Sequence, residues 1–166
     1  MSVWGSVRII RATAWAWSFA ALLQGQAVLV APAAAADLVD FASVALATSS
    51  AEQPERSPRE AVDGDEKTRW AGDNAQPGHW LQLELSEPRP VSACRLVWEF
   101  PNRTYLYKLE GSTDGKNWQT LVDASQKARP GREELPLPGT ELPRTQFRWF
   151  RLTHLGNHWP SVRELR

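Results

Sequence analysis

Strict alternation of apolar and polar residues is the feature that most limits how this chain can fold. Within residues 79–85, Leu81, Leu83 and Leu85 fall on one face, and residues 104–111 alternate in the same way. Successive side chains of a β-strand point to opposite faces, so this pattern predicts strands with one buried and one solvated face. Such strands need a second layer to cover the apolar side.

Other short segments also have strand character and are separated by turn residues. Pro90 and Pro101 bound an apolar segment, 91–100, and Asp114-Gly115 lies in a turn. One helical turn is predicted at 57–60, with Ser57 as cap, Pro58 in the first position and Glu60 in the third. Many short strands with little helix predict an all-β, antiparallel β-sandwich. The remaining predicted strands are 39–47, 117–122, a weak strand at 133–137, and 146–155.

Aromatic residues and the cysteine are predicted to serve the core. Cys94 lies in an apolar segment and is the only cysteine, so no intramolecular disulfide can form. A lone thiol in a strand is typical of a small buried hydrophobe. Most of the six tryptophans that follow residue 36 are predicted to be core residues, because each buries a large apolar surface: Trp70, Trp80, Trp98, Trp118, Trp149 and Trp159.

The first 36 residues have the features of a secretory signal peptide. Arg8 and Arg11 precede an apolar segment, and Ala34 and Ala36 form a small-residue cleavage motif before Asp37. An uncleaved membrane anchor is the alternative, although residues 24–26 interrupt the apolar segment. Cleavage predicts one domain over residues 37–166 that is secreted or periplasmic and has no membrane partner. Cleavage removes two arginines, leaving 17 basic and 19 acidic residues. That balance argues against nucleic acid as a partner.

Residues 61–70, here called the Asp-Gly loop, carry oxygen-rich side chains around a glycine. Asp63, Asp65 and Thr68 lie within six positions, and Gly64 permits a tight turn between the aspartates. Calcium prefers several oxygen ligands on a sharply turned loop, although the spacing differs from that of an EF-hand. A metal-binding loop and a solvated Asp-Gly turn both fit this segment.

Several motifs taken together resemble the discoidin family, also called the coagulation factor V/VIII type C domain. The resemblance spans about residues 38–165 and includes the bacterial carbohydrate-binding modules of the galactose-binding type. It departs from the family in lacking the paired cysteines of animal members and in ending soon after Glu164-Leu165, which indicates either a weakened closing strand or an incomplete gene. The motifs are Ala47-Thr48-Ser49-Ser50, the Asp-Gly loop, the alternating segment 80–85, the strand–turn–tryptophan segment 107–118, and residues 148–152 and 161–165.

The resemblance implies a jelly-roll β-sandwich that carries a structural calcium ion. In many bacterial members this ion joins the Asp-Gly-Asp loop to the C-terminal end of the chain. Carried over by position, the implied ligands are Asp63, Asp65, Thr68, Glu164 and a backbone carbonyl near Ala61.

The resemblance also implies that loops at one end of the sandwich bind a carbohydrate. A sugar has an apolar C–H face and a rim of hydroxyl groups, so its site pairs an exposed aromatic ring with polar groups. Trp159 is predicted as the stacking platform, with Glu99 and Arg103 as the hydroxyl-binding pair. Alternatively, Trp159 covers the end of the sandwich and Arg103 is solvated. The implied ligand residues are Glu99, Asn102, Arg103, His154, His158 and Trp159.

The predicted function is therefore a secreted, non-catalytic binding module for a carbohydrate or glycoconjugate. An adhesion domain for protein or phospholipid, or an accessory module separated from a glycoside-active enzyme, is the alternative. His154 and His158 lie in a loop, and their spacing alone does not define a transition-metal site. No nucleophile–base pair, phosphate-binding glycine loop or independent pair of acids indicates an enzyme.

Overall fold

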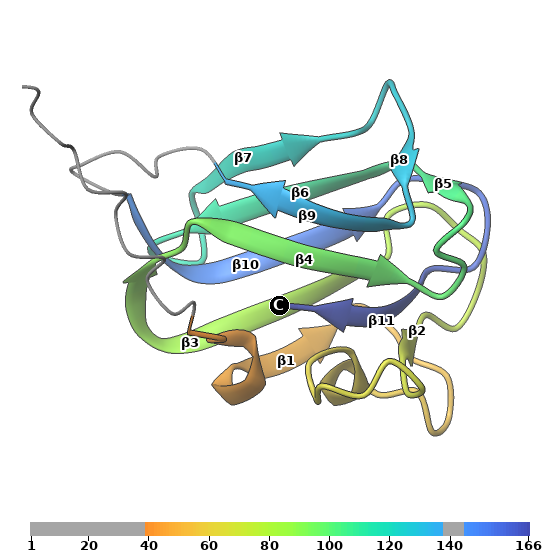
Figure 1. The fold of residues 1–166 in the computed structure, drawn as a ribbon, viewed down its shortest axis with the longest axis horizontal. Helices are drawn as coiled ribbons and strands as arrows, with labels where there is room; N and C mark the ends of the chain where they lie inside the picture. The colour runs from red at the N-terminus through yellow and green to blue at the C-terminus, as the bar shows by residue number, and fades with distance from the viewer. Residues whose placement is uncertain (1–38, 138–144) are drawn as a thin grey trace, which may run out of the picture. The chain divides into compact units, whose positions relative to one another are not determined.

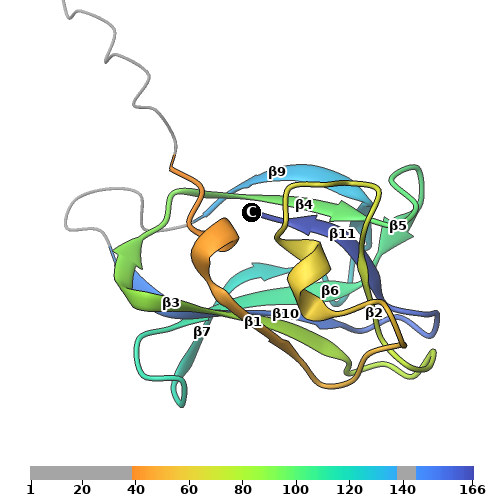
Figure 2. The same cartoon turned by 90° about the horizontal axis from the view of Figure 1, so that it is seen from below.

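Two antiparallel sheets face one another in the computed structural model of this protein, which describes residues 39–137 and 145–166 (Figures 1 and 2). The larger sheet has the order β1 (Leu46–Ser49), β3 (Trp80–Pro90), β10 (Gln146–His154), β6 (Tyr107–Ser112) and β7 (Trp118–Asp123). The smaller has the order β2 (Trp70–Ala71), β11 (Ser161–Leu165), β4 (Ala93–Trp98) and β9 (Arg132–Pro136). A third pair joins β5 (Thr104–Tyr105) to β8 (Arg129–Pro130). The predicted all-β antiparallel sandwich is confirmed.

The core lies between the two main sheets and follows the alternation of the sequence. Leu81, Leu83 and Leu85 of β3 are buried, while the intervening residues of that strand are partly exposed. Cys94 is a buried free thiol, and burial raises its pKa to about 12, so it is an inert hydrophobe as predicted.

The first predicted strand, residues 39–47, is wrong in its first half. The Ala42 N–H donates to Asp40 Oδ1 at 3.0 Å, and the short 3₁₀ helix η1 (Ala42–Val44) follows. An aspartate side chain that bonds to the backbone two residues on favours a turn over an extended strand. The strand β1 therefore begins only at Leu46.

The predicted helical turn near residue 58 is confirmed as the 3₁₀ helix η2 (Pro58–Ala61). Ser57, however, makes no side-chain capping bond, so that part of the prediction is wrong. Glu60 instead accepts a bond from the Arg69 N–H at 3.3 Å, which ties η2 to the end of the Asp-Gly loop.

The prediction that most tryptophans belong to the core is also wrong. Of the six tryptophans that the structure describes, only Trp70 and Trp98 are fully buried, and Trp159 is 51% exposed. The other three are only partly buried. Arginine side chains, and not the opposite sheet, cover their rings. Guanidinium groups lie 4.2–5.1 Å from the ring centres, Arg151 over Trp80 and Trp118, and Arg148 over Trp149.

The closing strand is not weakened as expected. Strand β11 lies between β2 and β4 and is almost entirely buried. Arg166 and Arg95 exchange two backbone hydrogen bonds, at 2.6 and 2.9 Å, which continue the pairing beyond Leu165.

The predicted signal peptide, residues 1–36, lies outside the described residues. In the part of the chain that the structure describes, no helix combines the length and apolar character needed to cross a membrane.

Candidate functional site

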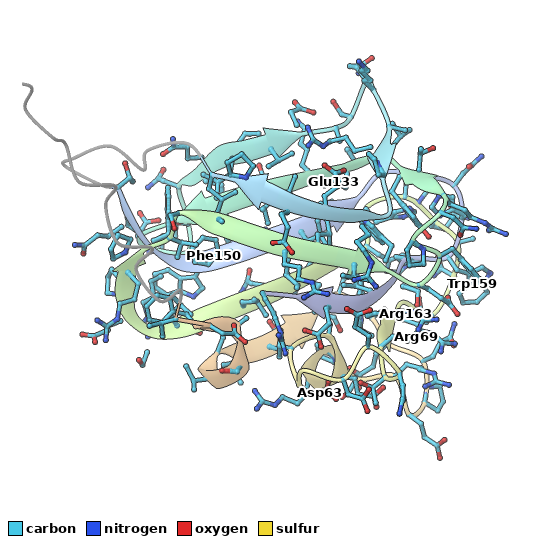
Figure 3. The ribbon with its side chains drawn as sticks, viewed as in Figure 1. Asp63, Arg69, Glu133, Phe150, Trp159 and Arg163 are labelled. Atoms are coloured by element: carbon cyan, nitrogen blue, oxygen red, sulfur yellow. The ribbon has the colours of Figure 1, made fainter. Side chains whose placement is uncertain are left out.

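A pocket of about 120 Å³ opens at one end of the sandwich. Its residues come from the turn after β4, from β5, from the loop between β10 and β11, and from the first residue of β11. Trp159 and Phe100 are the exposed aromatic residues of the pocket, at 51% and 43% exposure. Figure 3 shows Trp159 at this end of the ribbon, with Arg69 and Arg163 nearby. The seven lining residues are Glu99, Phe100, Arg103, Tyr105, His158, Trp159 and Ser161.

Backbone and hydroxyl bonds fix the turn that carries three of these residues. The Arg103 N–H donates to the Phe100 carbonyl at 3.0 Å, and the Tyr105 hydroxyl lies 3.3 Å from the Phe100 nitrogen. Gly131 packs against this turn, because a Cβ there would lie 2.6 Å from the Phe100 carbonyl oxygen. Only glycine permits so close an approach of two backbone segments.

The pocket rests on a stack of aromatic rings. Tyr105 lies parallel to Trp98 with ring centres 4.4 Å apart, and His158 meets Tyr105 edge-on at 5.1 Å. Below them, His154 lies 4.6 Å from His158 and 5.6 Å from Trp98. Aromatic pairs at these separations stabilise one another beyond simple burial. Packed rings therefore support the side of the pocket that Tyr105 and His158 form.

His154 is a buried part of that stack rather than a surface residue. Its side chain is 1% exposed, so the prediction that it contacts ligand does not agree with the structure. Neither ring nitrogen has a hydrogen-bond partner among the described residues. Burial, reinforced by His158 and His79, lowers the pKa of His154 to about 4 and keeps it neutral.

Two charged side chains line the pocket, and their surroundings differ. The Glu99 carboxylate pairs with Arg69 at 3.2 Å, and Arg163 Nε donates to the Glu99 carbonyl at 3.0 Å. The Arg103 guanidinium lies 4.3 Å from the centre of the Phe100 ring. Ser161 is also polar, and its buried hydroxyl has no partner within the described residues.

The structure thus brings together four of the six predicted ligand residues: Glu99, Arg103, His158 and Trp159. Asn102 lies outside the lining, and His154 lies beneath it. Sequence reasoning missed Phe100, Tyr105 and Ser161. Tyr105 follows the core phase of an alternating segment, and the turn that places Phe100 beside it depends on Gly131, 31 positions away.

The Asp-Gly loop is tied to the closing strand by a direct hydrogen bond. Gly64 has φ +88° and its N–H donates to Glu164 Oε1 at 3.0 Å. Glu164 is 2% exposed, and its Oε2 pairs with Arg166 Nε at 2.8 Å. Burial raises the pKa of Glu164, and Asp63 adds to that rise. Figure 3 shows Asp63 in the loop after η2.

Oxygen atoms crowd around one hydroxyl in this loop. Thr68 Oγ1 lies 2.8 Å from Asp63 Oδ2, 2.7 Å from the Asp65 carbonyl and 3.3 Å from the Glu60 carbonyl. A hydroxyl has one proton, so it cannot satisfy three acceptors at once. The Asp65 carboxylate turns away and accepts from the Lys67 N–H at 2.9 Å. Among the described residues, no three His, Cys, Asp or Glu side chains converge, so a cation here would need hydroxyl and carbonyl ligands as well.

The fold and this end pocket define a class of jelly-roll β-sandwich with a loop-built site. A family model described as F5/8 type C domain matches residues 45–165, and the chain belongs to that family.

Solved structures of carbohydrate-binding modules have the same fold. CpGH89CBM32-4 from Clostridium perfringens, in complex with GlcNAc-α-1,4-galactose, is 18% identical with a TM-score of 0.68, covering 80% of this chain and 94% of its own. A pectin-binding carbohydrate-binding module is 28% identical with a TM-score of 0.59, covering 73% and 87%. A curated relative, the polysaccharide lyase 8 family protein HylA of Enterococcus faecalis, is 38% identical over 61 residues. That match spans 37% of this chain and 4% of HylA.

Proposed function

We propose that this protein is a non-catalytic carbohydrate-binding module that binds sugar in the pocket around Trp159. The observation that carries the proposal is the combination, in one pocket, of exposed aromatic rings with polar side chains. The apolar face of a sugar ring stacks on an indole, while hydroxyl groups bond to fixed polar atoms. Each group has its role: Trp159 stacks, and Glu99 and Arg103 bond to hydroxyls.

Sugar complexes of proteins with the same fold support this proposal. One similar structure is the family 32 module of Clostridium perfringens NanJ in complex with galactose, and another is a chitosan-binding module of a Paenibacillus enzyme with chitotriose. A third, from AlyQ, holds 4,5-unsaturated mannuronic acid. The ligands differ, so the fold leaves the choice of sugar to the loops.

A glycan microarray followed by calorimetric titration tests the proposal. Trp159→Ala is expected to reduce binding of any positive sugar by at least about tenfold, because it removes the stacking surface. Trp118→Ala is the matched control, since it removes a partly exposed tryptophan from β7 and is expected to leave binding unchanged. Equal binding by wild type and Trp159→Ala would place the sugar elsewhere. Binding to phospholipid vesicles with no sugar bound would favour the adhesion alternative.

The proposal includes a structural calcium ion in the Asp-Gly loop. Asp63, Thr68 and the carbonyls of Asp65 and Glu60 would hold it, because their oxygens gather around Thr68 Oγ1. Glu164 would join them from the closing strand, where it already bonds to the Gly64 N–H. In this set Asp65 would offer its backbone carbonyl instead of its carboxylate, and the Glu60 carbonyl would be the one near Ala61. The ion would neutralise the crowded oxygens and supply no catalytic chemistry. Calorimetric titration of chelator-treated protein measures it, and an absence of binding heat and of any stability change would remove it from the proposal.

Secretion is part of the same proposal. A basic and then apolar N-terminal segment with a small-residue cleavage motif supports export and cleavage before Asp37. N-terminal sequencing of the exported protein is expected to begin at Asp37. A cytoplasmic protein that retains Met1 would contradict it.

A further inference from the structure

The charges of the pocket are unequally paired. Glu99 is the carboxylate that lines it, and Arg69 already neutralises that carboxylate at 3.2 Å. Arg69 does not line the pocket, but its positive charge cancels the negative charge of Glu99. The Glu99–Arg69 pair therefore contributes little net charge to the pocket. A positively charged ligand group would have to compete with Arg69 for the Glu99 carboxylate.

Arg103 has no such partner. Within residues 39–137 and 145–166, its side chain forms no ion pair and no hydrogen bond, although it lines the pocket. Its guanidinium lies 4.3 Å from the centre of the Phe100 ring, and that stacking uses the face of the group. The N–H donors point outward in the plane of a guanidinium, so stacking leaves them available.

The backbone around Arg103 makes the group well positioned. The Arg103 N–H donates to Phe100, and the Arg103 carbonyl accepts from the Gly131 N–H at 2.8 Å. A guanidinium held by a stacked ring and a fixed backbone loses little freedom when it binds a ligand. The pocket therefore presents one positioned positive charge beside the stacking surface of Trp159.

From this arrangement we infer that the pocket selects an acidic sugar. A hexuronate, in which a carboxylate replaces the hydroxymethyl group of a neutral hexose, fits this chemistry. Its ring stacks on Trp159 and its carboxylate accepts two parallel N–H bonds from Arg103, a pairing stronger than bonds between neutral groups. This inference rests on the proposed function, because it names the sugar class for the same pocket.

Matched sugar pairs test the inference. Methyl galacturonoside with methyl galactoside, and methyl glucuronoside with methyl glucoside, differ only at the group in question. Calorimetric or NMR titration at 20 mM NaCl is expected to give at least about tenfold tighter binding of the uronoside in one pair. At 500 mM NaCl the difference is expected to shrink to about threefold, because salt screens an accessible charge.

Two arginine variants locate the effect. Arg103→Gln is expected to abolish the preference for the uronoside, because uronoside binding falls to the level of neutral-sugar binding, which itself loses at most one hydroxyl contact. Arg89→Gln, which removes an exposed arginine of β3, is expected to leave the preference unchanged. Unfolding curves that match wild type establish that both variants are folded.

The outcomes separate this inference from the proposed function. Equal binding of both members of each pair, tighter binding of the neutral member, or a preference that survives Arg103→Gln overturns the inference and leaves the sugar-binding module standing. If no sugar binds to the wild type, or if Trp159→Ala binds as well as the wild type, the proposed site fails and the inference fails with it.

Discussion

Strand β11 contributes residues to the pocket and also bonds to the Asp-Gly loop, yet the two regions are held together by different kinds of contact. Ser161 at the start of the strand lines the pocket, and Glu164, three residues on, bonds to the Asp-Gly loop. Rings stacked on Trp98 support the pocket, whereas carboxylate, hydroxyl and carbonyl oxygens crowd the loop. Stacked rings are stable without help, but crowded oxygens repel one another. The pocket should therefore hold its shape unaided, and the loop should depend on a cation.

Removing the base of the aromatic stack is expected to have the largest effect. Trp98→Ala should lower the free energy of unfolding by about 3–5 kcal/mol, because Trp98 is fully buried and the change leaves a large cavity. Trp159→Ala, at an exposed position of the same region, should change it by less than about 0.5 kcal/mol. Urea denaturation measures both. Similar losses in the two variants would show that the exposed rim, too, holds the pocket together.

Calcium is expected to stabilise the protein through the Asp-Gly loop. At a calcium concentration about 100 times the dissociation constant, the free energy of unfolding should rise by about 2.7 kcal/mol. Asp63→Asn should remove most of that gain, since it keeps the shape of the side chain but takes away its charge. Asp123→Asn, an aspartate of β7, is the control and should retain the gain. The proposed cation would be refuted by superimposable urea curves in calcium and in chelator.

Low pH is expected to lower the free energy of unfolding, because His154, in the aromatic stack below the pocket, is neutral when the protein is folded. Its pKa is lowered to about 4 from 6.5, so the unfolded chain binds more protons between these values. Stability therefore falls as the pH drops from 7.5 to 5, and this one group should account for about 2 kcal/mol of the loss. His154→Phe should lack this share of the pH dependence. A wild type and variant with parallel stability profiles would mean that His154 is not held neutral.

Gly64 offers the smallest and most local test of the loop. Gly64→Ala should destabilise the protein by about 1–2 kcal/mol, because φ is +88° and the added Cβ would lie 2.6 Å from Arg166 Nη2. Gly78→Ala is the matched control, with φ +99° and no atom within 4 Å of the added Cβ, and should cost about 1 kcal/mol. In an Arg166→Ala background, the stability loss caused by Gly64→Ala should fall to about that of the Gly78→Ala control. A larger loss at Gly78 would mean that Arg166 does not pack on this turn.

The sequence predicted most of the fold because strand alternation is a local property. Leu81, Leu83 and Leu85 mark the buried face of β3 without reference to any other segment. The sequence prediction failed where local hydrogen bonds competed with strand formation, as at Asp40. It also failed where a side chain from a neighbouring strand covered a ring, as Arg151 covers Trp80 and Trp118. Neither event can be seen in hydrophobic periodicity.

The candidate site was predicted only in part, and that prediction did not come from strand alternation. Trp159 stands out because it lies outside any alternating segment, and the motifs shared with a known family indicated the loops that carry Glu99, Arg103 and His158. His154 was misplaced because it is the last residue of strand β10, where a shift of one residue exchanges the buried face for the exposed one.

The sequence alone determined most of the longer strands, their buried faces and the oxygen-rich side chains around Gly64, since each depends on neighbours within a few positions. Only the tertiary structure decided that Glu99 is neutralised by Arg69, that Arg103 stacks on Phe100 with no acidic partner among the described residues, and that Glu164 meets a loop 100 residues earlier. Charge pairing depends on distances between segments that are far apart along the chain, and the packing of the two sheets sets those distances.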